Sequence, residues 1–221
     1  MHEYQLSNLP NVIIAGIGTD VGKTVASAIV TEALEADYWK PVQSGALDQT
    51  DRDTVRSLVS NPKSQFHPES YRLGQPISPH AAARAENIEI VFDNIILPRT
   101  HRQIVIELAG GVMSPLTETL HNLDLISMLG FPVIIVSRNY LGSINHTLLT
   151  VEACTARGAQ IAGIIFDGTP IASTEDFIEN YTRLPVIGRI EPEPEITREA
   201  VRRYAEQMRD SLINILTPLR V

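Results

Sequence analysis

The glycine-rich segment IAGIGTDVGKTV, residues 14–25, constrains the fold of this chain more than any other part of the sequence. It follows the β-branched run 12–15 and leads into VASAIVTEAL, which has the composition of a helix. A turn between a buried strand and a helix lies at the carboxyl edge of a parallel sheet, where α/β proteins bind ligands. The Gly-Lys-Thr triplet therefore predicts a phosphate-binding loop. The usual template has four residues between the first glycine and the triplet, whereas five separate Gly16 from Gly22 here.

Short apolar runs alternate with longer amphipathic stretches along the rest of the chain. Runs that are apolar on both faces are typical of strands covered by helices on each side. The alternation predicts an α/β fold, a doubly wound, mostly parallel sheet flanked by helices, in a single domain over residues 1–221. The predicted strands are 12–15, 38–40, 104–107, 133–136, 161–165 and 186–188, and the predicted helices are about 23–35, 51–60, 118–129, 143–157, 174–181 and 197–215. The proline-rich stretch 61–81 is predicted to be a long loop, and such loops are often functional.

Composition limits the location and the partners of the protein. Cys154 is the only cysteine, which excludes an internal disulfide and favours a reducing, cytoplasmic location. No apolar run is long enough to span a bilayer, and the N-terminal MHEYQLSNLPNV lacks the features of a signal peptide. The net charge of −8 argues against nucleic acid or an anionic membrane as a partner, but not against a small anionic ligand.

Charged residues at other strand ends extend the predicted phosphate site. Lys23 would add positive charge to the loop, and Thr24 could ligate magnesium. Lys40 ends a predicted strand and would face a transferred phosphoryl group, although a surface lysine is the alternative. Glu107 ends the run QIVIE and is a natural Mg²⁺ ligand beside a phosphate loop. Asp51 begins the next helix, as does Asp53, and for both the alternative is helix capping.

Six segments, in order, resemble the dethiobiotin synthetase family. The family's phosphate loop is itself the longer form, with five residues before Gly-Lys-Thr, and GIGTDVGKT matches it. The other matching segments are YWKPVQSG at 38–45, TDRDTV at 50–55, SPHAAA at 78–83, ELAGGVMSPL at 107–116 and LGSINHTLLT at 141–150. The resemblance spans about residues 11–195.

This resemblance implies an ATP-dependent cyclo-ligase of biotin biosynthesis. Such an enzyme closes 7,8-diaminopelargonic acid with carbon dioxide, supplied from bicarbonate, to dethiobiotin through a phosphorylated carbamate. It implies ATP as co-substrate, Mg²⁺ as cofactor and a cytoplasmic homodimer. Two alternatives are a partition-type ATPase of the same fold and a regulatory module that binds nucleotide without making product. The first normally carries a signature lysine early in the loop, where Ile17 and Gly18 stand here.

Site residues follow from the same resemblance. Lys23 and Lys40 are implied to be catalytic. The implied metal ligands are Thr24, Asp51 and Glu107, with Asp51 chosen over Asp53 because it follows Thr50. The implied ATP contacts are Asp20, Val21, Gly22, Lys23, Thr24, Val25, Asp51, Glu107, Leu108, Ala109, Gly110, Asp167, Gly168, Glu191, Pro192 and Glu193. The implied substrate contacts are Thr19, Ser44 and Asn145, the last reaching a neighbouring subunit or, alternatively, serving only as a polar residue of its own helix.

Three positions depart from the family pattern. Leu108 stands where glycine is frequent, and Asp167 stands where an asparagine reads the adenine edge. The segment EPEPEI at 191–196 is unusually acidic for a loop near the base. Leu108 would alter the path of the backbone near the phosphates, and the aspartate at position 167 predicts a weaker preference for ATP over other nucleoside triphosphates than an asparagine-bearing relative would show.

Overall fold

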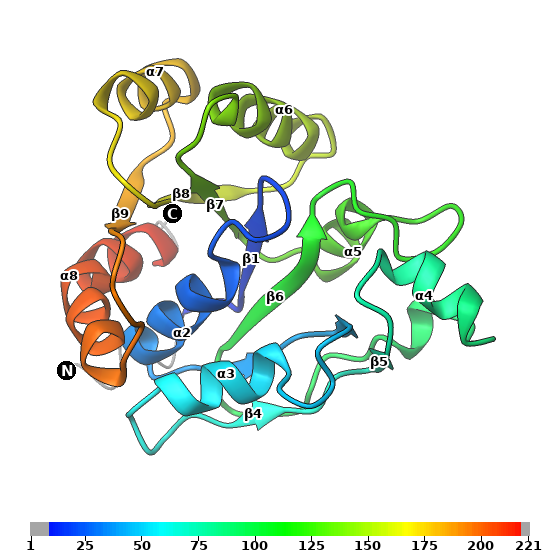
Figure 1. Cartoon of the computed structure of the whole chain (residues 1–221). Coiled ribbons are helices and arrows are strands. Elements are labelled where there is room, and N and C mark those ends of the chain that lie inside the picture. The colour runs from blue at the N-terminus through cyan, green and yellow to red at the C-terminus, as the bar shows by residue number, and fades with distance from the viewer. Residues whose placement is uncertain (1–8, 218–221) are drawn as a thin grey trace.

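A seven-stranded sheet organises the computed structural model, which describes residues 9–217 (Figure 1). The strand order is β4-β2-β6-β1-β7-β8-β9, and each neighbouring pair is parallel. The strands are β1 Val12–Gly16, β2 Asp37–Trp39, β4 Phe66–His67, β6 Ile104–Gly111, β7 Val133–Arg138, β8 Ile161–Asp167 and β9 Val186–Ile190. This order confirms the predicted doubly wound parallel sheet.

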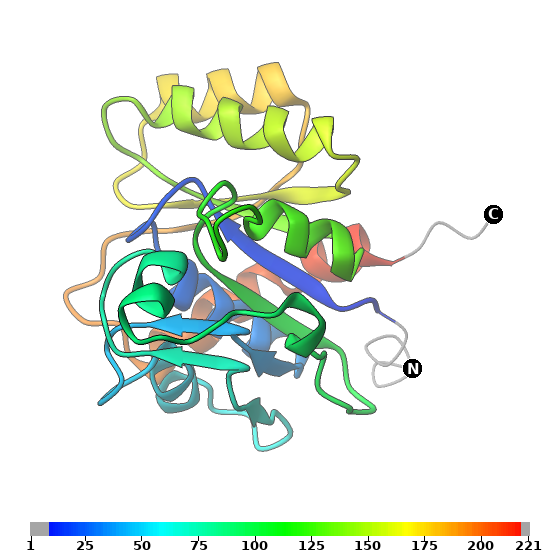
Figure 2. The same ribbon diagram turned by 90° about the vertical axis from the view of Figure 1, so that its right-hand side faces the viewer.

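Helices cover both faces of the sheet, with α6 and α7 on one side and α2 and α8 on the other (Figures 1 and 2). The helices on the α2 side are α2 Lys23–Leu34, α3 Asp51–Leu58 and α8 Arg198–Leu216. Those on the opposite side are α4 Pro79–Ala85, α5 Asn122–Leu129, α6 Ser143–Ala156 and α7 Ala172–Thr182. The predicted α5 began at 118 and was four residues too long at its start, because Asp124 accepts the His121 N–H and caps the helix there.

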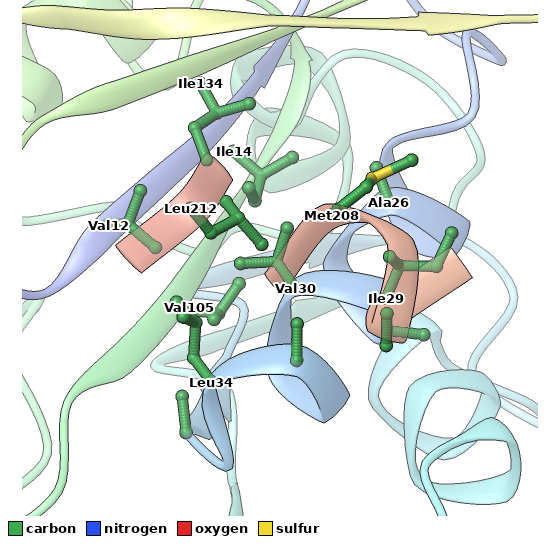
Figure 3. Close-up of a cluster of buried hydrophobic side chains, with 14 of the residues drawn as sticks. Val12, Ile14, Ala26, Ile29, Val30, Leu34, Val105, Ile134, Met208 and Leu212 are labelled. Carbon is green, nitrogen blue, oxygen red and sulfur yellow. The ribbon is translucent and has the colours of Figure 1, made fainter. Parts of the chain in front are cut away.

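Two apolar cores follow from the alternation of side chains along the strands. Val12 and Ile14 of β1 point to the core shared with α2 and α8, whereas Ile13 and Ala15 point to the core under α5 and α6. Figure 3 shows Ile14 and its neighbours on β6 and β7 packed against α2 and α8. Each fully buried aliphatic side chain contributes about 1.5–3 kcal/mol. The central strands therefore form a rigid base for the residues at their carboxyl ends.

The predicted loop over 61–81 is wrong in part, because it contains two short strands. β4 adds to the edge of the main sheet, and β5 Tyr71–Leu73 pairs in parallel with β3 Val42–Ser44 to form a second, two-stranded sheet. These pairings provide hydrogen-bond partners for backbone groups of this segment, and a proline-rich sequence does not reveal those partners. Helix α4 begins at Pro79, where the missing proline N–H costs nothing.

Two expectations from composition concern membranes and export. Within residues 9–217, no helix is both long and apolar enough to cross a membrane. The predicted absence of a signal peptide concerns a segment whose residues 1–8 lie outside the described range.

Candidate active site

The phosphate loop joins β1 to α2 and leaves backbone donors without partners. Its path requires Gly16, since a methyl group there would lie 2.7 Å from Val21 Cγ2 and 3.0 Å from the Gly18 carbonyl oxygen. Asp20 and Gly22 have positive φ angles of 55° and 89°. In the described part of the chain, no acceptor bonds the backbone N–H groups of residues 21–25. Unpaired N–H groups at a helix N-terminus attract an anion.

Lys23 lies inside this loop. Its side chain is buried, and Nζ donates a hydrogen bond of 2.6 Å to the Gly18 carbonyl oxygen. Burial lowers the pKa of Lys23 to about 8; Glu107 opposes this shift and the nearby Lys40 ammonium adds to it. An anion bound in the loop would therefore stabilise the charged form of Lys23.

Lys40 pairs with two carboxylates at the end of β2. Its Nζ forms an ion pair with Asp51 Oδ2 and lies 3.1 Å from Glu107 Oε1. Burial lowers the pKa of Lys40, but Glu107 and Asp51 outweigh this effect and the net pKa is raised. Tyr38 donates a hydrogen bond of 2.9 Å to the other oxygen of Glu107, which is buried. Lys40 is thus a buried ammonium, and the surface-lysine alternative is wrong.

Three oxygen atoms converge beside these lysines. Thr24 Oγ1 lies 3.0 Å from Asp51 Oδ1 and 2.9 Å from Glu107 Oε1. A hydroxyl has one hydrogen and cannot donate to both carboxylates at once, so the set has spare acceptor capacity. In residues 9–217, no group of three or more His, Cys, Asp or Glu side chains gathers as a metal site. The set fits Mg²⁺, which takes one or two carboxylates and completes its shell with phosphate oxygens and water.

Asp51 and Asp53 have different surroundings although both begin α3. Asp53 Oδ2 accepts from the Thr50 backbone N–H at 3.1 Å, and Thr50 Oγ1 accepts from the Asp53 N–H at 3.2 Å, which forms a capping box. Asp51 instead points to Thr24 and Lys40. The geometry supports Asp51 as the metal-ligand candidate.

A cavity of about 690 Å³ opens over this cluster. The predicted site residues that line it are Thr19, Asp20, Val21, Gly22, Lys23, Thr24, Val25, Lys40, Ser44, Asp51, Glu107, Ala109 and Gly110. In the described chain, Ser44 Oγ is buried without a hydrogen-bond partner. A buried hydroxyl without a partner is costly, so it favours a ligand that supplies one.

The other predicted residues lie elsewhere. Leu108 is buried in the core under α5, so its side chain contacts no ligand there, and β6 continues through it to Gly111. Asn145 is exposed on α6. Asp167 and Gly168 lie at and just after the end of β8. The loop with Glu191, Pro192 and Glu193 follows β9 and is held to α8, where the Glu191 N–H and Glu193 Oε1 both bond the Tyr204 hydroxyl.

Several cavity residues were missed by the sequence interpretation. They are Gln43, Ala46, Pro76, Ile77, Ser78, Pro79, Ser114 and Arg138. The stretch 76–79 belongs to the predicted loop 61–81, and residues 78–79 also belong to the SPHAAA segment, so it could have been named. Arg138 ends β7, but the predicted strand stopped at Val136, so the rule that selected Lys40 and Glu107, a charged residue at a strand end, did not reach it.

Comparisons with known proteins identify the family of this chain. A family model described as an AAA domain matches residues 10–200. An ATP-dependent dethiobiotin synthetase of Christiangramia forsetii is 50% identical over 91% of this chain and 97% of its own. The enzymes of the same name from Cytophaga hutchinsonii and Chlamydia pneumoniae are 48% and 42% identical, over 90% and 91% of this chain and 96% and 90% of theirs.

Solved structures show the same fold at low identity. A ParA family ATPase from Chlorobium tepidum has a TM-score of 0.53 at 15% identity, covering 92% of this chain and 97% of its own. The cell division ATPase MinD of Pyrococcus furiosus has a TM-score of 0.53 at 13% identity, covering 92% of this chain and 100% of its own. At such identity these structures support the fold alone. The sequence relatives are far closer, and the chain belongs to the dethiobiotin synthetase family of AAA-domain proteins.

Proposed function

We propose that this protein is an ATP-dependent cyclo-ligase that closes 7,8-diaminopelargonic acid with carbon dioxide to dethiobiotin in biotin biosynthesis. The observation that carries the proposal is the meeting of two buried ammonium groups and three oxygen ligands at one cavity. Phosphoryl transfer depends mainly on positioning and on stabilising negative charge, and this arrangement suits both. Its relatives in the family carry the name ATP-dependent dethiobiotin synthetase.

The proposed reaction has three steps. An amine of the diamine adds to carbon dioxide and loses a proton, which forms a carbamate. A carbamate oxygen then attacks the γ-phosphorus of ATP, and ADP leaves. The second amine attacks the carbonyl carbon and loses a proton, the C–O bond to phosphate breaks, and the ureido ring closes with release of phosphate.

Side chains of the cavity would act at the steps in which negative charge develops. Lys23 and Lys40 would hold the γ-phosphate and the carbamate and stabilise the negative charge that develops between them. Thr19 lines the cavity, and Ser44 Oγ is buried in its wall, so both hydroxyls can orient the carbamate or the free amine. Thr24, Asp51 and Glu107 would hold Mg²⁺, which when bound would offset charge on the phosphates.

A direct assay tests the proposal. Protein, the diamine, bicarbonate, MgCl₂ and ATP are incubated together, and dethiobiotin is sought by mass alongside phosphate release. We expect phosphate release that requires both the diamine and bicarbonate. A partition-type ATPase or a nucleotide-binding regulatory module would release phosphate without them or not at all. Either result would reject the ligase function.

A homodimer belongs to the same proposal. Asn145 is exposed on α6, on the helix that also carries exposed Leu149 and His146. Leu149 and Met113 are 60% and 52% exposed and line a second hollow of about 440 Å³ that also contains Thr19. Large apolar side chains gathered around a hollow mark a contact surface. A second copy that covers this surface would bring its Asn145 toward the site.

Complementation between variants tests the shared site. Asn145→Ala chains mixed with Lys23→Ala chains should regain about a quarter of wild-type activity, because half of the dimers are mixed and each holds one intact site. Each variant alone should be inactive or nearly so. With subunit exchange confirmed by mass, absence of recovery would place Asn145 outside the neighbour's site.

The predicted cytoplasmic location and the single-domain organisation of the chain are also part of the proposal.

A further inference from the structure

Arg138 is the last residue of β7 and contacts the phosphate loop. Its Nη1 donates a hydrogen bond of 2.8 Å to the carbonyl oxygen of Asp20. Its Nε lies 3.7 Å from Oδ2 of Asp167, which is its register partner on β8. Arg138 also lines the large cavity. One guanidinium thus contacts the loop and a carboxylate of the neighbouring strand at the same time.

The contact with Asp20 fixes one peptide of the loop. Asp20 has a φ of 55°, a conformation that costs energy for a residue with a side chain. In a trans peptide, the carbonyl and the following N–H point in opposite directions. Holding the Asp20 carbonyl toward Arg138 therefore turns the Val21 N–H away from it. In the described chain that N–H has no acceptor, so it remains a donor for a ligand.

The contact with Asp167 concerns charge. Asp167 packs against the loop so closely that a methyl group at Gly22 would lie 2.7 Å from its Cγ. Its side chain is only 16% exposed, so its charge is weakly screened. An ionised carboxylate at this place repels the phosphates of a nucleotide. Arg138 is the cation beside it; burial raises the pKa of Asp167 and Arg138 opposes that shift.

We propose that Arg138 is a positioning residue of the phosphate loop: it fixes the Asp20–Val21 peptide and balances the charge of Asp167, so that the loop accepts a nucleoside triphosphate. This inference rests on the proposed function to the extent that the ligand is ATP. Arg138 needs both of its contacts for this role. A lysine would keep the charge but lose the planar fork that reaches two acceptors.

Calorimetric titration with MgATP tests the proposal on the full-length protein. Arg138→Ala should raise the Kd about tenfold or more, since charge-assisted hydrogen bonds are about twice as strong as neutral ones. Arg138→Lys should lie between Arg138→Ala and the wild type. Adding Asp167→Asn to Arg138→Ala should recover part of the affinity, because the unbalanced carboxylate is gone, but not all of it, because the peptide remains unheld.

Arg157→Ala is the matched control, since Arg157 is similarly exposed and pairs with Asp124 away from the cavity. It should bind MgATP like the wild type. In steady-state assays, Arg138→Ala should raise the KM for ATP and leave the KM for the diamine unchanged. Thermal unfolding of each variant shows whether the fold is intact, so a general structural defect would be recognised by equal losses for both substrates.

Two results would overturn the inference. Arg138→Ala with a Kd within about twofold of the wild type would remove Arg138 from the loop's function, since a lost hydrogen bond to a charged group should exceed that. A double variant no tighter than Arg138→Ala would remove the charge-balancing role. The dethiobiotin assay on the wild type is a separate readout. If the wild type makes dethiobiotin but Arg138→Ala binds MgATP normally, this inference alone is rejected. If Arg138→Ala binds MgATP more weakly but the wild type makes no dethiobiotin, the proposed function alone is rejected.

Discussion

The two ends of the proposed ATP site differ in how their charged side chains are paired. At the phosphate end, defined by Lys23, Thr24, Lys40, Asp51 and Glu107, a buried ammonium and two carboxylates bond one another. At the base end, defined by residues 167–168 and 191–193, the acidic groups pair with arginines that are about half exposed: Asp167 with Arg138, and Glu193 with Arg203. The phosphate end is a closed network, and the base end is a set of partly screened pairs.

This difference determines what a substitution does. Removing one member of a buried network leaves a charge without a partner, which is costly for both stability and chemistry. Removing one member of a half-exposed pair leaves a charge that water and salt screen in part, so it should change nucleotide binding more than the fold or the chemical step. We therefore expect large effects on turnover and stability at the phosphate end, and smaller, selective effects on nucleotide binding at the base end.

The largest expected effect is the loss of turnover in Lys23→Ala and Lys40→Ala. Each should lower kcat about a hundredfold or more, the scale for removing a preorganised group that stabilises developing charge. Lys63→Ala is the control, because Lys63 pairs with Glu35 at the surface and does not line the cavity. Dethiobiotin formation at saturating substrates is the measurement. Near-normal turnover in Lys40→Ala would contradict its catalytic role.

Stability should separate the two lysines. Lys40→Ala leaves buried Glu107 without its cation and should lower the free energy of unfolding by about 3 kcal/mol, the lower end for a broken buried pair because Asp51 is partly exposed. Lys23→Ala removes a lysine whose pKa is lowered by burial and whose Nζ, within residues 9–217, bonds only the Gly18 carbonyl oxygen, so it should cost less. Urea unfolding of both proteins measures this. Equal losses of unfolding free energy would show that the ion pairs of Lys40 stabilise the fold no more than the contacts of Lys23 do.

The aspartates of α3 give an internal control for the metal. Asp51→Asn should raise the half-saturating Mg²⁺ concentration about tenfold to a hundredfold, the range for changes in groups that support a metal site. Asp53→Asn should leave it unchanged and cost little stability, because the Thr50 hydroxyl still accepts from the backbone N–H of residue 53. Magnesium titrations of turnover at fixed ATP compare the two variants. A larger Mg²⁺ effect in Asp53→Asn would reverse the assignment.

The phosphate end could be predicted from the sequence because its residues stand at or near the ends of the predicted strands. Parallel strands align their carboxyl ends at one edge, so Lys40, Glu107 and the loop before Lys23 were expected to meet once the strands were recognised. The predicted strand 104–107 was too short, since β6 continues past Glu107 to Gly111. Asp51 needed the resemblance, since a helix start alone cannot tell a ligand from a cap. The pairing of Lys40 with both carboxylates depends on the directions of the side chains, which the sequence pattern does not predict.

The base end could not be predicted in the same way. Its residues are placed by contacts distant in sequence, such as the bond of Glu191 and Glu193 to Tyr204 on α8 and the approach of Arg138 to Asp20. The short strands β4 and β5 escaped prediction for a related reason, because two- and three-residue strands carry no period and form through pairing alone.

The smallest expected effect concerns Asp167 and the choice of base. Adenine offers N7 as an acceptor beside the N6 donor, so an aspartate bonds N6 but faces N7 with a second acceptor. Asp167→Asn removes that conflict, which is worth about 1–3 kcal/mol, and should raise the preference for ATP about tenfold for each 1.4 kcal/mol. The accompanying loss of charge should tighten ATP, GTP and CTP equally, so the ratios of their Kd values isolate the base contact. Glu118→Gln is the control, since Glu118 pairs with Arg84 and does not line the large cavity. Unchanged ratios in Asp167→Asn would leave Asp167 as the partner of Arg138 and would remove it from base recognition.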